Sequence, residues 1–176
     1  LPICVASSLA FVCALFMAGC TSVASGSDDG ATWPHAQPVA VPSGDVVLTV
    51  ADDGVLTEFD VQALEALGAQ SIVVDDPFVN RSLSLDAVPL VVVLAAAGIG
   101  PDDALTWRAL DNYEVYFTGA ELLDDRAWLA IRQDNDLIDI ADGGPVRVVF
   151  TNLDGPLGRD TNQWIWSLDR IEVNSR

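Results

Sequence analysis

Hydrophobic and polar residues alternate in short runs from residue 45 onward, and most runs end at a glycine or an acidic pair. Alternation with a period of two indicates half-buried strands. The pattern predicts strands at 46–50, 55–59, 71–74, 105–110, 113–118, 128–132, 145–150 and 164–173. Acidic, Asn and Gly residues at 52–54, 111–112 and 134–136 predict the turns between strands. Residues 75–81 are interpreted as an irregular stretch.

Helix-capping residues between the strands predict short helices. Short helices are expected at 61–67, 90–97 and 119–123. Asp60 is placed to cap the first helix, which stops at Gly68, and Pro89 is placed as the first helical residue of the second. Thr118 and Glu121 have the spacing of a capping box for the third. Short strands with three small helices predict an α+β domain, mixed but mostly β.

The first residues have the character of an export signal. Residues 1–19 carry no charge, residues 3–18 are almost entirely apolar, and small residues directly precede Cys20. This arrangement resembles the lipobox of bacterial lipoproteins, in which the cysteine is lipidated and the preceding residues are removed. The alternative is a single transmembrane anchor, since about 20 apolar residues can span a bilayer. Under either interpretation the domain lies outside the cytoplasm, in the cell envelope.

Three regions follow from this interpretation. Residues 1–19 form a signal peptide, residues 20–44 a lipidated cysteine with a flexible Ser-, Gly- and Pro-rich tether, and residues 45–176 the domain. Cys4 and Cys13 leave with the signal and Cys20 is capped by lipid, so the mature domain has no free thiol. The single histidine, His35, lies in the tether. Thiolate metal sites and histidine-based catalytic triads are therefore not expected.

Charge narrows the classes of partner. The chain has 26 acidic and eight basic residues, a net charge of −18, and all of its basic residues are arginine. A nucleic-acid partner is excluded, because binding to phosphates needs clustered basic side chains. Electrostatic adhesion to anionic lipid is excluded for the same reason. The acidic clusters at 102–103, 124–125 and 134–142 are either solvated surface or oxygen-rich calcium sites without EF-hand spacing.

Four segments carry a recognisable order of motifs. They read LDAVPL leading to LAAAG at 85–98, LDNYEV at 110–115, WLA followed by GGPVRVV at 128–149, and QWIW through RIEV at 163–173. In this order they resemble the molybdopterin-binding domain of sulfite-oxidase-type oxidoreductases. The resemblance covers about residues 46–173 and implies that family's mixed, mostly-β fold.

The same resemblance suggests a set of site residues. Catalytic members of the family ligate molybdenum through a cysteine about a dozen residues before the V-P-L segment, where this chain has Asp75. Candidates for holding the cofactor are Asn112 and Tyr113 of the second segment, Arg159 near the family's basic positions, and Trp164 of the last segment. Arg147 is the best candidate for holding an anion, and its alternative role is to pair with a nearby aspartate.

These features favour a lipid-anchored, extracytoplasmic protein whose domain is a non-catalytic ligand-binding or interaction module. Its partners would be the membrane, through the lipid anchor, and an anionic small ligand or another protein. The alternative function is a molybdopterin-dependent oxidoreductase, in which Asp75 or the substrate completes the metal's coordination. A third interpretation is a partner-docking protein without a small ligand.

Overall fold

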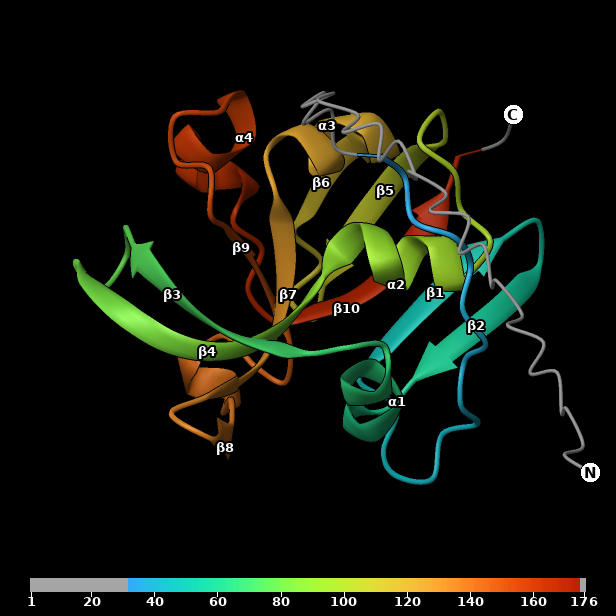
Figure 1. The fold of residues 1–176 in the computed structure, drawn as a ribbon, viewed down its shortest axis with the longest axis horizontal. Helices are drawn as coiled ribbons and strands as arrows, with labels where there is room; N and C mark the ends of the chain where they lie inside the picture. The colour runs from blue at the N-terminus through green and yellow to red at the C-terminus, as the bar shows by residue number, and fades with distance from the viewer. Residues whose placement is uncertain (1–31, 175–176) are drawn as a thin grey trace, which may run out of the picture. The chain divides into compact units, whose positions relative to one another are not determined.

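The computed structural model describes residues 32–174 (Figure 1). Its strands are β1 (Leu48–Asp52), β2 (Val55–Phe59), β3 (Gln70–Asp76), β4 (Arg81–Pro89), β5 (Ala104–Ala109), β6 (Glu114–Thr118), β7 (Ala127–Gln133), β8 (Asp136–Leu137), β9 (Arg147–Phe150) and β10 (Leu168–Val173). Its helices are α1 (Val61–Ala66), α2 (Leu90–Ala96), α3 (Gly119–Asp124) and α4 (Pro156–Arg159), with 3₁₀ turns η1 (Ile140–Asp142) and η2 (Thr161–Gln163).

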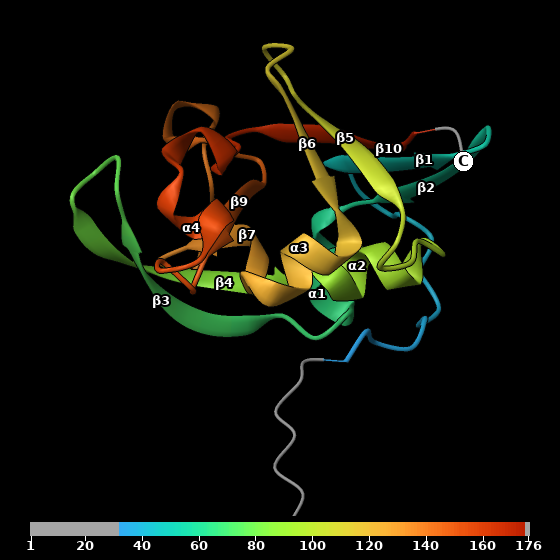
Figure 2. The same ribbon diagram turned by 90° about the horizontal axis from the view of Figure 1, so that it is seen from above.

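The strands form two sheets. The first has the order β2-β1-β10-β5-β6, in which β1 and β10 run parallel and the other pairs are antiparallel. The second has the order β3-β4-β7-β8, and β9 also pairs with β7. Helices α1, α2 and α3 lie on one side of the first sheet (Figure 2). The expectation of an α+β domain with mostly strands and a few short helices is confirmed at this level.

Helix α2 is the centre of the core. Five of its seven residues are buried, and it packs against α3, β4 and β7. A helix that is apolar on all sides needs neighbours on all sides, and the two sheets and the other helices supply them. Trp107 is one of the largest fully buried side chains of the core, and its ring meets the buried ring of Phe117 edge to face with centroids 5.2 Å apart.

The expected caps and turns are present. The Asp60 carboxylate accepts a hydrogen bond from the backbone N–H of Ala63 at the start of α1. Thr118 and Glu121 form the complete capping box of α3. Pro89 differs slightly, because it lies at the N-cap of α2 rather than inside the helix. Asn112 has a φ of 67°, as a tight turn between β5 and β6 requires.

The interpretation of 75–81 as irregular is wrong. Strand β3 continues through Asp76, and β4 begins at Arg81, so the two form a long hairpin with a turn at 77–80 (Figure 1). The alternating burial of Leu83, Leu85 and Ala87 places their side chains on one face of β4. Serines and Asp86 at the intervening positions kept this strand from standing out by composition.

The last expected strand is shorter than its alternating pattern. Strand β10 begins at Leu168, because Ser167 has a φ of 51° and redirects the chain. Trp164 and Trp166 therefore precede the strand and do not share a strand face. This correction matters for the candidate site, since both indoles border the same pocket.

The segment from 32 to 47 lies along the domain without forming a helix or strand. Trp33 and Val39 are half-buried and pack against the core. The Asp60 carboxylate accepts hydrogen bonds from the backbone N–H groups of Ser43, at 2.7 Å, and Gly44, at 2.8 Å. The last part of the expected tether therefore contacts the domain at these four positions, although most of its side chains are exposed. The expected signal peptide, the expected lipidation site Cys20 and the first part of the expected tether lie outside the described residues.

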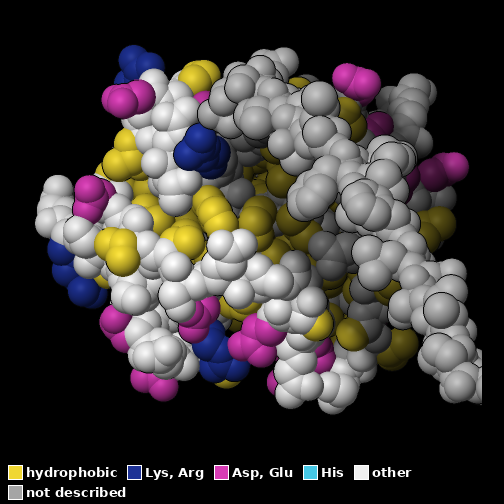
Figure 3. Space-filling view, in the orientation of Figure 1, with side chains coloured by type: hydrophobic (Ala, Val, Ile, Leu, Met, Phe, Trp, Pro, Cys, Tyr) yellow, Lys and Arg dark blue, Asp and Glu magenta, His cyan; other side chains and the backbone are white. Residues whose placement is uncertain are grey.

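Charged side chains are dispersed over the surface. On the face shown in Figure 3, acidic and basic side chains lie around a central region of hydrophobic side chains. Between residues 32 and 174, no helix is both long and apolar enough to cross a membrane.

Asp60 makes stability depend on pH. Hydrogen bonds from the N–H groups of Ala63, Gly44 and Ser43, in that order of effect, hold the pKa of Asp60 below its ordinary value of 3.8. Its stabilising effect is therefore fully present above that value and is lost as the pH falls through the lower folded pKa. We expect Asp60→Asn to lower the Tm near neutral pH, and the difference from the parent protein to shrink on acidification.

Thermal unfolding followed by circular dichroism over a range of pH tests this expectation. Asp53→Asn is the matched control, because Asp53 is exposed in the β1–β2 turn and asparagine tolerates its φ of 45°. A Tm difference between Asp60→Asn and the parent that stays constant down to the acid limit would contradict the assigned role.

Candidate functional site

Two of the expected site residues border one pocket. Tyr113 and Trp164 line a pocket of about 220 Å³ together with Phe78 and Trp166. The remaining lining residues are Ala109 and Asp111. These side chains come from three separate places in the fold, namely the β3–β4 turn, the β5–β6 turn and the segment before β10. The pocket is thus built by tertiary packing of loops on two sheets.

A buried ion pair contacts two of the residues that line this pocket, Trp166 and Phe78. Arg147 of β9 and Asp76 of β3 are each about 2% exposed, and Nη2 of Arg147 lies 2.9 Å from Oδ2 of Asp76. The other Asp76 oxygen accepts hydrogen bonds from the backbone N–H groups of Phe78, at 2.8 Å, and Val79, at 3.2 Å. Asp76 therefore shapes the hairpin turn and neutralises Arg147 at the same time.

Arg147 is engaged within the protein through both of its terminal nitrogens, whereas its buried Nε has no hydrogen-bond partner in the described part of the chain. Its Nη1 donates to the carbonyl oxygen of Asp142 at 3.4 Å, and its guanidinium lies over the Trp166 ring, 5.4 Å from the ring centre. Burial lowers the pKa of Arg147, and the neighbouring Asp76 carboxylate opposes that shift. Pairing with an aspartate, which the sequence left open, is the role that the structure gives to Arg147.

Backbone hydrogen bonds hold Trp166 over Arg147. The segment around 164–168 pairs with the segment around 143–148: the N–H of Ser167 donates to the carbonyl of Gly143 at 2.6 Å, and that of Val148 to Ile165 at 2.8 Å. Gly143 has a φ of 88°, and a Cβ there would lie 2.7 Å from the Trp166 ring. Only glycine fits both the backbone conformation and the close approach of the indole.

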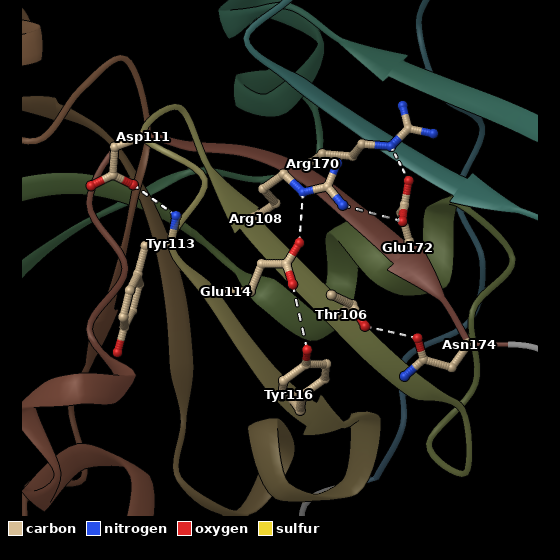
Figure 4. Close-up of polar contacts among 9 residues, drawn as sticks. All are labelled: Thr106, Arg108, Asp111, Tyr113, Glu114, Tyr116, Arg170, Glu172 and Asn174. Carbon is tan, nitrogen blue, oxygen red and sulfur yellow. Dashed lines mark hydrogen bonds and ion pairs between the residues drawn. The ribbon is translucent and has the colours of Figure 1, made fainter.

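The other aromatic walls are fixed by polar contacts. The Trp164 indole N–H donates to the carbonyl of Gly158 at 3.0 Å, and its ring packs edge to face on Phe150. The Tyr113 hydroxyl donates to the carbonyl of Asn162 at 2.8 Å, and the side chain extends from the β5–β6 turn toward the α4–η2 segment (Figure 4). Both rings are thus held in place before any ligand arrives.

Asp75 is separated from this site by the pleat of its strand. Its side chain is exposed on the face of β3 opposite to Asp76, and its carboxylate accepts a hydrogen bond from the Ser82 hydroxyl. It does not line the pocket. The two aspartates differ in this way because adjacent residues on a strand point to opposite faces.

Asn112 and Arg159 also lie apart from the pocket lining. Asn112 is exposed, and its part in the structure is the positive φ of the β5–β6 turn. Arg159 is exposed at the end of α4, where its Nη2 donates to the carbonyl of Asp154 at 2.7 Å. Of the five residues expected to hold a cofactor, Tyr113 and Trp164 line the pocket and Arg147 lies behind it.

Other arginines are engaged on the outer face of the first sheet. Arg108 pairs with Glu114 at 2.8 Å and with Glu172 at 3.9 Å, and Arg170 pairs with Glu172 (Figure 4). The hydrogen bond and charge of Glu114 raise the pKa of Arg108. These ion pairs are partly exposed, so each contributes little to stability. Their effect is to leave fewer basic side chains available to a ligand.

The side chains present do not fit a pyranopterin cofactor. Its phosphate would need accessible cationic groups, but Arg147 is neutralised by Asp76, and Arg159, at the end of α4, is not a lining residue of the pocket. The residue at the expected metal position, Asp75, faces solvent on the hairpin. Over the described part of the chain, no three His, Cys, Asp or Glu side chains are grouped as a metal site requires.

A larger hollow, of about 500 Å³, lies elsewhere between residues 44–62 and 137–145. Its lining includes the exposed aliphatic side chains of Val46, Leu137 and Ile140. It contains none of the site residues that the family resemblance suggests. We therefore regard the smaller, aromatic pocket as the candidate functional site.

Two pocket residues were missed from the sequence. Phe78 lies in a stretch interpreted as irregular, and no local pattern indicated that its ring meets Trp166 at a centroid distance of 5.4 Å. Asp111 was assigned only to a turn. Trp166 was included in the expected strand 164–173 but was given no place in the site. Recognition of the β3–β4 hairpin in the sequence would have placed Phe78 in its turn.

The ion pair yields a test of what holds the site together. Asp76→Ala leaves a buried, unpaired guanidinium and removes the acceptor of two turn N–H groups, so we expect the free energy of unfolding to fall by about 3–5 kcal/mol. Asp75→Ala is the matched control, and we expect a change within about 0.5 kcal/mol because Asp75 is exposed. Urea unfolding measures both.

The double variant Asp76→Leu with Arg147→Met keeps the test decisive if Asp76→Ala does not fold. Replacing both charges by apolar groups removes the unpaired charge, so it should be more stable than Asp76→Ala. Equal losses for Asp75→Ala and Asp76→Ala would show that the buried pair is not the main constraint.

Comparison with models of known protein families gives no match. Comparison with curated protein sequences gives none either. What the aromatic pocket does is therefore inferred from its own geometry.

Proposed function

We propose that this protein is a lipoprotein of the bacterial cell envelope whose domain binds a small ligand without catalysing a reaction. The domain would be a derivative of the molybdopterin-binding fold of sulfite-oxidase-type oxidoreductases. It would be anchored on the extracytoplasmic face of the membrane through lipid on Cys20. The candidate binding site is the aromatic pocket that contains Tyr113 and Trp164.

One observation carries this proposal. Tyr113 and Trp164, singled out by the family resemblance, line the same pocket, while Asp75 at the expected metal position is exposed on another surface. The concave, mainly aromatic lining is typical of small-molecule sites. A loss of the metal position with retention of the pocket favours binding over redox chemistry.

The content of cofactor in the purified protein tests the non-catalytic assignment. The full chain is produced in a host that synthesises molybdopterin, with molybdate supplied, and is analysed for molybdenum and for the fluorescence of oxidised pterin. We expect neither at a significant fraction of the protein. Near-stoichiometric molybdenum would overturn the proposal in favour of a molybdopterin-dependent oxidoreductase, and pterin without metal would identify the ligand.

Lipid anchoring is tested separately. Cells expressing the full chain are labelled with palmitate and fractionated, and we expect label and membrane association for the parent protein. Both should be lost in Cys20→Ala, because this substitution removes the acceptor of the lipid. Cys13→Ala is the control and should retain both. Membrane association without label would instead favour the apolar segment as a transmembrane anchor.

A further inference from the structure

We propose that the aromatic pocket selects a small organic cation, of the alkylated-ammonium class. This inference rests on the proposed ligand-binding function and specifies its ligand. A cationic ligand also replaces the anionic ligand that Arg147 alone led us to expect, because Asp76 already neutralises that guanidinium.

The aromatic rings carry the first part of the argument. Four of the six lining residues are aromatic, and they come from different loops, so their rings border the pocket from several sides. The negative face of an aromatic ring attracts a cation, most strongly for tryptophan, and groups of such rings recognise quaternary ammonium ions. The volume of about 220 Å³ suits a compact ligand or the head group of a larger one.

The charge of the pocket points the same way. Asp111 is the only lining residue with an ionisable acidic or basic side chain at neutral pH. One of its oxygens accepts a hydrogen bond from the Tyr113 backbone N–H at 2.9 Å, as Figure 4 shows, which holds the carboxylate at the turn. The net charge of −18 adds a long-range field that attracts cations.

Arg147 is a cation close to one of these rings, and it does not oppose the assignment. Its charge is balanced by Asp76 at 2.9 Å, within the protein interior. Its position 5.4 Å from the Trp166 ring centre shows that an indole of this site already accommodates a cation. Arg147 is not a lining residue, so its guanidinium does not occupy the pocket in which a ligand would bind.

A matched pair of probes tests the charge requirement. Choline and its neutral isostere dimethylbutanol, in which carbon replaces the ammonium nitrogen, are titrated into the full chain in detergent at low salt. Binding is followed through the indole N–H resonances of Trp164 and Trp166. We expect choline to bind about tenfold more tightly than the isostere, a difference within the range of a desolvated cation–π interaction.

Variants locate the effect. Asp111→Asn should weaken choline binding several-fold and leave the isostere unchanged, because it removes only the charge. Phe78→Ala should weaken both, because it removes an exposed wall of the pocket. Tyr116→Ala is the control, since this exposed tyrosine lies on the outer sheet face and contacts Glu114 instead (Figure 4). Added salt should weaken choline alone.

Equal affinity for choline and the isostere would overturn the cation inference while leaving a small-molecule pocket, and therefore the proposed function, in place. Tighter binding of inorganic phosphate at the same resonances would also overturn it and restore the anion expectation. No shift with choline, the isostere or phosphate would overturn it as well, and the cofactor analysis above then decides the proposed function on its own.

Discussion

The Arg147–Asp76 ion pair joins the two parts of the molecule on which the candidate site depends. Arg147 lies on β9, next to the turn that supports Trp166, and Asp76 lies at the end of β3, where it organises the turn that carries Phe78. A buried charge is tolerated only when it is paired, so neither side chain can leave without exposing the other to an apolar interior. The relative position of the two aromatic walls is therefore fixed by electrostatics as well as by packing.

Local features of the chain were predictable because they depend on a few adjacent residues. The cap at Asp60, the capping box at Thr118 and the β5–β6 turn each follow from side chains that bond to their own neighbourhood. Strand β4 was missed although its polar and apolar residues alternate, because serine and aspartate stand where strands usually carry β-branched or aromatic residues. Strand order could not be predicted, since pairing between distant segments leaves no local trace.

For the candidate site, too, single residues could be predicted, whereas their arrangement could not. Tyr113 and Trp164 were identified through a resemblance, and their meeting in one pocket depends on the packing of loops from both sheets. The roles of Asp75 and Asp76 could not be told apart, because a one-residue change in strand register exchanges the buried and exposed faces. Arg147 was recognised as important, but whether it holds a ligand or an aspartate is decided by which residue β3 presents to it.

The position of β10 has a consequence for how the chain assembles. It is the last strand of the described chain, yet it lies in the middle of the first sheet, between β1 and β5. During synthesis, the β1–β2 and β5–β6 hairpins can form early but have no shared partner until β10 emerges. Sheet completion therefore waits for contacts of long sequence separation, which slows folding.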